Sequence, residues 1–153
     1  MSLIEVVVYL ALFGVIFLLI IQFVIDTNKN NNFARHRNII EKTSLFVLRQ
    51  LDLNVKPGIV LDDTESIFDS NQGKLVFSKD SIVYQYYIQN DRLFFNEGTN
   101  NSEMLDPNMK INAFLIEKVI NNDQTVGLRI TLELESISLD TVNKNVTTMY
   151  LIK

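Results

Sequence analysis

The sequence predicts an α+β protein in which a long N-terminal helix precedes an antiparallel β-sheet domain. Residues 6–25 carry no charged side chain, and residues 33–53 place apolar side chains at helical spacing. From residue 74 onward, apolar and polar side chains alternate as they do in strands. We therefore expect a helix over residues 1–53 and a globular sheet domain over residues 54–153, with a single core.

The uncharged segment from Val6 to Ile25 is long enough to cross a membrane. A helix of this length spans about 30 Å, which matches the hydrocarbon core of a bilayer. Glu5 lies at the edge of the segment, where an ionised carboxylate is costly unless another charge pairs with it. The first basic side chain is Lys29. The remaining candidate partner is the α-amino group of Met1, in the same chain or in a neighbouring copy.

The segment Met1-Ser2-Leu3-Ile4-Glu5, continuing to Gly14, resembles the N-terminus of mature type IV pilins and pseudopilins. That family combines an apolar first residue with a glutamate at position five and a glycine near position fourteen. Two departures stand out. Met1 replaces the usual phenylalanine, and Gln22 replaces the proline that many major pilins carry there.

The resemblance implies a structural subunit and not an enzyme. In the family, a prepilin peptidase removes a short leader, the new first residue is N-methylated, and the fifth-position glutamate neutralises the terminal amine of an adjacent subunit. Carried onto this chain, these roles fall on Met1 and Glu5. The implied partners are other copies of the chain in a helical filament, the pilus assembly machinery and the cytoplasmic membrane before assembly. The apolar helix would form the filament core, and the sheet domain would complete the ladle-shaped fold of pilins.

Orientation in the membrane depends on the leader. Basic residues follow the apolar segment, which by itself would place the C-terminal domain in the cytoplasm. A basic leader, typical of the family, would restore the opposite orientation, with the sheet domain outside and the filament on the cell surface. An initiator Met1 without a leader is the alternative.

Two other functions remain open at this stage. The chain could be a minor pilin or pseudopilin that primes or tips a filament made mainly of another protein. It could also be a single-pass anchored domain that binds a ligand through its sheet and never polymerises. Roles in adhesion, motility, DNA uptake or secretion are not distinguished by the sequence.

Weak helix formers follow the apolar segment. Residues 26–32 contain four asparagines and form either a polar helical neck or a frayed stretch. We expect any departure from regular helical geometry near Gly14 and Gln22 or in this neck, especially in an assembled filament.

The second half of the helix has two apolar stripes. Phe33, Ile40, Val47 and Leu51 form one stripe, and Ile39, Phe46 and Leu53 form the other. Either both belong to one wide core face, or one packs on the sheet domain and the other on neighbouring helices. The Pro and Gly in residues 54–58 are expected to end the helix.

Strands are expected in a single sheet at residues 74–78, 81–89, 92–96, 112–120, 125–135 and 146–152, with residues 97–110 forming a long loop. The acidic run from Asp62 to Glu65 could start a short helix or hold a cation, but a solvated loop is the favoured interpretation.

No catalytic pattern is visible. The single histidine, His36, lies between two arginines and is expected to face solvent, and the chain contains no cysteine. The net charge of −4 gives no field that would attract nucleic acid. Tyr9, Phe13 and Phe17 recur at i, i+4 and i+8, which fits lipid or helix packing better than an aromatic conduit. We expect no cofactor, metal or nucleic-acid partner.

Overall fold

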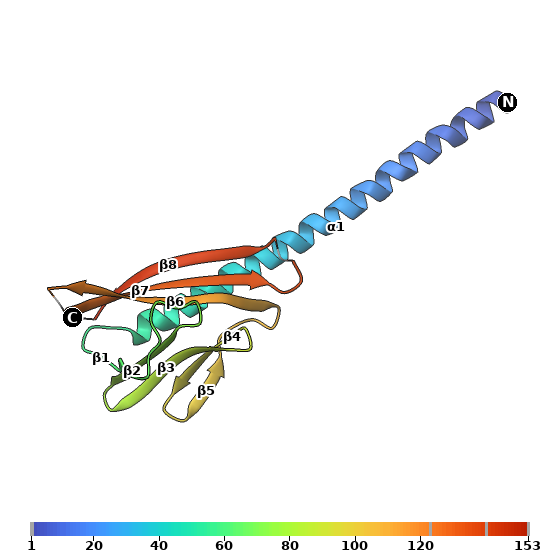
Figure 1. Ribbon diagram of the computed structural model, residues 1–153. Coiled ribbons are helices and arrows are strands. Elements are labelled where there is room, and N and C mark those ends of the chain that lie inside the picture. Colours follow the sequence, from blue (N-terminus) through green and yellow to red (C-terminus); the bar gives the residue numbers. More distant parts are fainter. Residues whose placement is uncertain (1, 123, 140, 153) are drawn as a thin grey trace. The chain divides into compact units, whose positions relative to one another are not determined.

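The structure is a computed structural model that describes residues 2–122, 124–139 and 141–152 (Figure 1). Across these residues it forms one helix and eight strands, which confirms the predicted α+β class with an apolar N-terminal helix followed by antiparallel strands. The elements are α1 (Leu3–Asn54), β1 (Val60–Leu61), β2 (Lys74–Lys79), β3 (Ile82–Gln89), β4 (Arg92–Glu97), β5 (Asn100–Glu103), β6 (Met109–Asn121), β7 (Gln124–Ser136) and β8 (Asn143–Leu151).

The chain divides into two compact units inside α1, between Arg35 and His36, and not at the end of the helix. The boundary lies there because the last third of α1 belongs to the core of the second unit. Ile40, Val47 and Leu51 are at most 1% exposed and pack with residues of the strands. The second unit therefore consists of residues 36–54 of α1 together with every strand.

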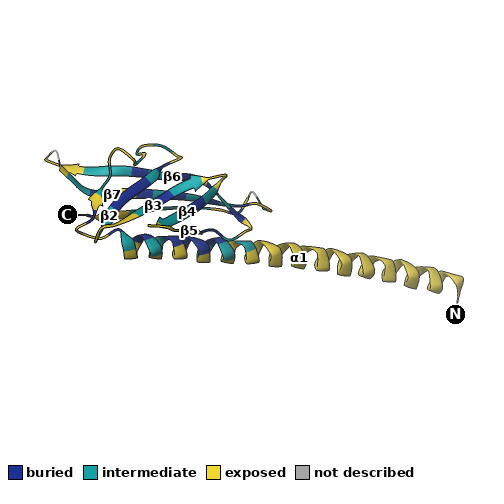
Figure 2. Ribbon diagram, turned by 90° about the horizontal axis from the view of Figure 1, so that it is seen from below, coloured by how far each residue is buried: buried dark blue, intermediate teal, exposed yellow. Residues whose placement is uncertain are grey.

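Only one of the two predicted helix stripes is buried. Ile39 lies half-buried against the core beside the buried stripe, but Phe46 and Leu53 are each 49% exposed. Phe33, expected in the buried stripe, is exposed within the first unit. The single wide core face is therefore wrong. Figure 2 shows buried, half-buried and exposed residues interspersed along this part of α1.

The strands form two sheets, where the sequence predicted one. A five-stranded sheet has the order β1-β2-β3-β4-β5, and a three-stranded sheet has the order β6-β7-β8. The sheets meet where the backbone N–H of Gly73 donates to the carbonyl of Phe114 at 2.9 Å. A Cβ at position 73 would lie 2.2 Å from that oxygen, so only glycine permits this approach.

Tight turns fix the register of the five-stranded sheet. Asp80 and Ser81 join β2 to β3, and Asn90 and Asp91 join β3 to β4. All four have positive φ between 50° and 66°, as two-residue type I′ hairpins require. Asn and Asp adopt this conformation more readily than most residues. The turn at Asn90 and Asp91 lies between the predicted strands, whereas the first turn lies one residue later than the predicted strand bounds of 74–78 and 81–89 imply.

Two strands, β1 and β5, were not predicted. The predicted loop at residues 97–110 contains β5, which pairs with β4 after a turn at Gly98, where φ is 61°. All four β5 residues are polar and exposed, so this edge strand shows no apolar alternation. The strands β6 and β8 also begin three residues earlier than predicted.

Two buried tyrosines connect residues 36–54 of α1 to the two sheets. The Tyr86 hydroxyl, from β3, accepts a hydrogen bond from Asn54 Nδ2 at 2.7 Å and donates to the Gln50 carbonyl at 3.3 Å. Burial raises the pKa of Tyr86 well above its usual range, which favours the protonated hydroxyl that donates this bond. The Tyr150 hydroxyl, from β8, donates to the Leu48 carbonyl at 3.3 Å.

We predict that Tyr86→Phe lowers the free energy of unfolding by about 1–2 kcal/mol, because Asn54 Nδ2 and the Gln50 carbonyl lose a buried partner while the ring still packs. Denaturant unfolding of the full chain in detergent, followed by circular dichroism, measures the loss. Tyr87→Phe is the matched control, since the Tyr87 hydroxyl bonds only to the exposed Asn101 side chain. Equal stability of the two variants would contradict the role of Tyr86.

Candidate membrane and assembly segment

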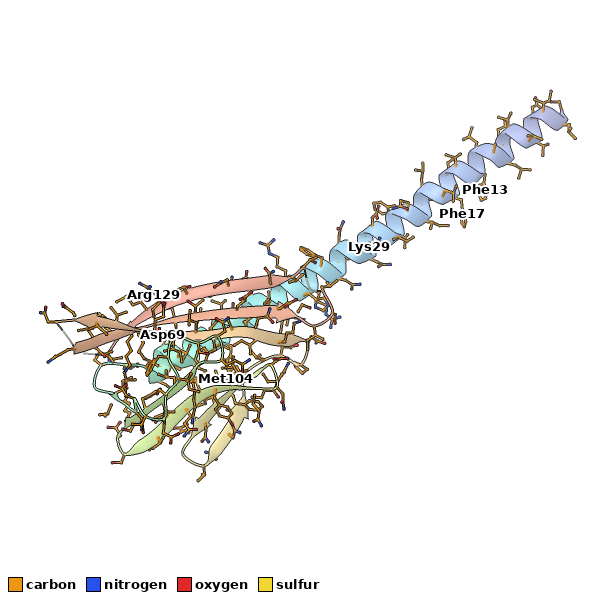
Figure 3. All side chains as sticks on the ribbon, viewed as in Figure 1. Phe13, Phe17, Lys29, Asp69, Met104 and Arg129 are labelled. Carbon is orange, nitrogen blue, oxygen red and sulfur yellow. The ribbon has the colours of Figure 1, made fainter. Side chains whose placement is uncertain are left out.

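The first unit exposes an apolar surface on every side of the helix. Between Leu3 and Ile25, each large apolar side chain is 40–83% exposed. The mean hydropathy of the most apolar 18-residue window in α1 is 2.9, and none of that window is buried. By length and composition α1 can cross a membrane. Figure 2 shows the exposed stretch, and Figure 3 shows its side chains pointing outward in all directions.

Glu5 caps the start of this helix. Its Oε2 accepts a hydrogen bond from the backbone N–H of Ser2 at 2.7 Å, and its own backbone N–H donates to Ser2 Oγ at 3.3 Å. This reciprocal pair is a capping box, in which Ser and Glu three residues apart satisfy two free N–H groups. The pattern Ser2-Leu3-Ile4-Glu5 signals the capping box in the sequence, a role of Glu5 additional to the one predicted from its charge.

Met1 lies outside the described residues. The expected pairing of its amine with Glu5, and its N-methylation, therefore stay predictions. Glu5 already has one intramolecular partner, so its carboxylate is not left without a hydrogen bond in the single chain. Each carboxylate oxygen can accept more than one hydrogen bond, so the capping box leaves room for a second donor.

Gly14 and Gln22 lie in uninterrupted helix, as do residues 26–32. In the single chain, the helix does not fray at the neck; whether it departs from regular geometry in an assembly stays a prediction. Gln22 Nε2 donates to both carboxylate oxygens of Asp26 at 3.1 Å, and Thr27 Oγ1 donates to the Phe23 carbonyl at 2.8 Å. The Gln22–Asp26 pair, at i and i+4, stabilises the helix just before the polar residues that follow.

Nothing inside the chain requires glycine at position 14. A Cβ there would meet no atom within 4 Å. Glycine in a helix interior is less stable than alanine by about 0.5–1 kcal/mol. Among the described residues, no packing contact therefore explains glycine at this position.

Two aromatic side chains of the segment stack on each other. The ring centroids of Phe13 and Phe17 are 6.3 Å apart with an interplanar angle of 14°, and Figure 3 shows them on the same side of the helix. Tyr9 forms no ring contact with them among the described residues. An i, i+4 pair is ordinary helix packing, and within the single chain the described rings form no continuous aromatic path.

His36 does not simply face solvent, which corrects the prediction. Its ring is half-buried in the second unit, and its Nδ1 lies 2.9 Å from Ser136 Oγ. Ser136 is fully buried at the end of β7, so its hydroxyl needs a partner from the helix. The contact joins residues 100 positions apart, which spacing along the chain could not reveal.

The acidic run forms a turn and not a helix. Asp62 Oδ1 accepts hydrogen bonds from the Thr64 hydroxyl at 2.7 Å and from the N–H groups of Thr64 and Glu65. The Thr64 hydroxyl contributes most to holding the pKa of Asp62 below its usual value. Within residues 2–122, 124–139 and 141–152, no group of three or more His, Asp or Glu side chains could hold a metal ion.

Comparison with protein-family models, curated proteins and solved structures found no match to this chain.

We predict that Ser2→Ala frays the first turn of α1. Losing the cap side chain destabilises a helix terminus by about 1 kcal/mol. Amide hydrogen exchange near Glu5, measured by NMR on the full chain in micelles, should accelerate about fivefold, whereas Ser2→Asp, which retains a capping oxygen, should exchange at the wild-type rate. Unchanged exchange in Ser2→Ala would rule out the capping box in solution.

Proposed function

We propose that this protein is a structural subunit of a type IV pilus or related surface filament, assembled by packing of its apolar N-terminal helix. The observation that carries the proposal is the combination of one acidic residue, Glu5, with a helix surface that is apolar on all sides from Leu3 to Ile25. Such a surface needs lipid or other helices around it. The resemblance of residues 1–14 to mature pilins favours other helices as its final environment.

Assembly would replace lipid contacts by helix–helix contacts. In an apolar medium, association depends on close packing of small residues and on polar contacts, since lipid is already apolar. Gly14 fits this requirement, because it leaves the helix surface open at a position where the chain itself does not use the space. Glu5 fits the second requirement as a charge that gains a partner on assembly.

In this proposal, Glu5 has two successive roles. In the single subunit it caps the helix through Ser2, and in the filament it also pairs with the terminal amine of a neighbouring copy. The pairing would set the axial stagger between subunits, because the carboxylate and the amine lie at fixed positions along their helices. The low local dielectric strengthens such a pair relative to water.

The resemblance also supports processing and location. We propose that a prepilin peptidase exposes Met1, that Met1 is then N-methylated, and that the sheet domain lies outside the cell. Mass spectrometry of the N-terminal peptide tests the processing, since it should begin at Met1 and carry an added methyl group. A formylated Met1 would contradict it.

A single-pass anchored receptor is the second candidate, because the same helix can cross a membrane without polymerising. The two functions differ in where the protein is found. A filament subunit should be recovered in surface material sheared from cells, whereas an anchored receptor should remain with the membrane fraction. A minor pilin would be recovered in sheared material only when the major subunit is present.

We predict that Glu5→Gln lowers filament yield at least about tenfold while the membrane pool of subunit stays intact, because glutamine preserves the capping box and removes only the charge. The measurement is an immunoblot of sheared and membrane fractions. Glu5→Asp should give an intermediate yield, since the charge remains but reaches less far. Glu5→Val should match Glu5→Gln.

Ser2→Ala is the control for capping, since it weakens the box and leaves the carboxylate in place. Its filament yield should remain near that of wild type. Wild-type assembly in Glu5→Gln, combined with lost assembly in Ser2→Ala, would reduce Glu5 to a helix cap and refute the intermolecular role.

A further inference from the structure

The five-stranded sheet has a second face that the core does not use. Side chains alternate along its strands, and Leu75, Tyr86 and Leu93 belong to the hydrophobic core. Tyr87 and Phe94 therefore point to the opposite face. There, cross-strand pairing aligns Lys74, Tyr87, Phe94 and Glu103 in one row and Val76, Gln85, Asn96 and Asn101 in the next.

The two aromatic side chains on this face form a fixed platform. The rings of Tyr87 and Phe94 stack with centroids 5.7 Å apart and an interplanar angle of 20°. Asn101 Nδ2, from the edge strand β5, donates a hydrogen bond to the Tyr87 hydroxyl at 3.0 Å. The Tyr87 ring is therefore held from two sides while remaining partly exposed.

A groove of about 490 Å³ lies beside Tyr87. It is lined by Ile67, Gln72, Gly73, Lys74, Gln85, Tyr87 and Ile88. A volume of this size is typical of small-molecule sites in proteins. The groove lies entirely within the second unit of the chain.

Several amide groups of this face lack partners. The side chains of Gln72 and Gln85 form no hydrogen bond with other described residues. In the next strand, Asn96 Oδ1 is buried and has no hydrogen-bond partner in the part of the chain that the structure describes. Lys74, by contrast, is paired with Glu65 at 3.2 Å, so the single positive charge in the groove is already compensated.

We propose that this groove binds a neutral saccharide. A sugar ring presents an apolar C–H face, which would pack on the Tyr87 ring, and a rim of hydroxyl groups. Each hydroxyl donates and accepts, as does each carboxamide, so Gln72 and Gln85 can satisfy hydroxyls of either orientation. A purely apolar ligand would bury these amides unpaired, and an anion would have to compete with Glu65 for Lys74.

The saccharide site is independent of filament assembly, because it requires only the folded second unit. The test therefore uses dispersed full-length chain in a zwitterionic detergent that has no sugar head group. The probes are cellotriose and triacetylchitotriose at millimolar concentration, with trialanine as a peptide of comparable size. Saturation-transfer NMR detects contact, and titration gives the dissociation constant of each probe.

Tyr87→Ala should weaken sugar binding at least about tenfold, and Gln85→Ala about threefold, whereas Tyr87→Phe should stay within about twofold because the ring remains. Gln89→Ala is the matched control, since Gln89 lies on the same strand and face but outside the groove. Its affinity should equal that of wild type. Circular dichroism confirms that each variant is folded.

Three results would overturn the proposal. The first is no saturation transfer to either sugar. The second is sugar binding that survives Tyr87→Ala unchanged in a folded protein. The third is transfer to trialanine and not to the sugars, which would assign the groove to extended peptides.

Discussion

Burial of a narrow stripe of α1 between two sheets is the constraint on which the second unit depends. Ile40, Val47 and Leu51 supply that stripe, and Tyr86 and Tyr150 bond to the helix from β3 and β8. The ion pair of Lys144 with Glu41 adds a contact nearer the start of β8. The two sheets also join each other directly, through Gly73 with Phe114 and through Ile111 with Asp91 at the turn between β3 and β4, and the helix packs in the core that both share.

The same helix also explains why the chain exposes so much apolar surface. Only one side of residues 36–54 of α1 packs against the strands, and Phe46 and Leu53 on the other side remain exposed. From Leu3 to Ile25 the helix is apolar around its whole circumference. These surfaces fit an environment of lipid or neighbouring helices better than water.

Much of this fold could be predicted from the sequence, because the strongest signals are local. The alternation from Leu128 to Leu134 and the turns at Asp80 and Asn90 depend only on neighbouring residues. The separation into two sheets depends on Gly73 meeting Phe114, and His36 meets Ser136 across the chain. Contacts between residues this distant in the sequence leave no periodic pattern of apolar side chains. The edge strand β5 was missed because solvent surrounds it and removes the alternation.

The candidate site was predicted in part. The apolar composition of residues 6–25 and the charge of Glu5 at their edge predicted this segment. The hydrogen bonds of Glu5 to Ser2 were not predicted, although the pattern Ser2-Leu3-Ile4-Glu5 was present. The amide and aromatic face of the five-stranded sheet depends on cross-strand alignment, which becomes visible only when β3, β4 and β5 are paired.

The contacts of β8 also determine when the domain can finish folding. Its hydrogen bonds to α1 join residues 102 and 103 positions apart. The helix residues are synthesised early, and they can form these bonds only after nearly the last residues of the chain have been made. Contacts this distant along the sequence form slowly because a long loop must close first. Until β8 arrives, Ile40 and Val47 lack part of their cover, and the nascent chain has a period in which aggregation competes with folding. Holding the N-terminal segment in a membrane during that period would keep unfinished chains apart.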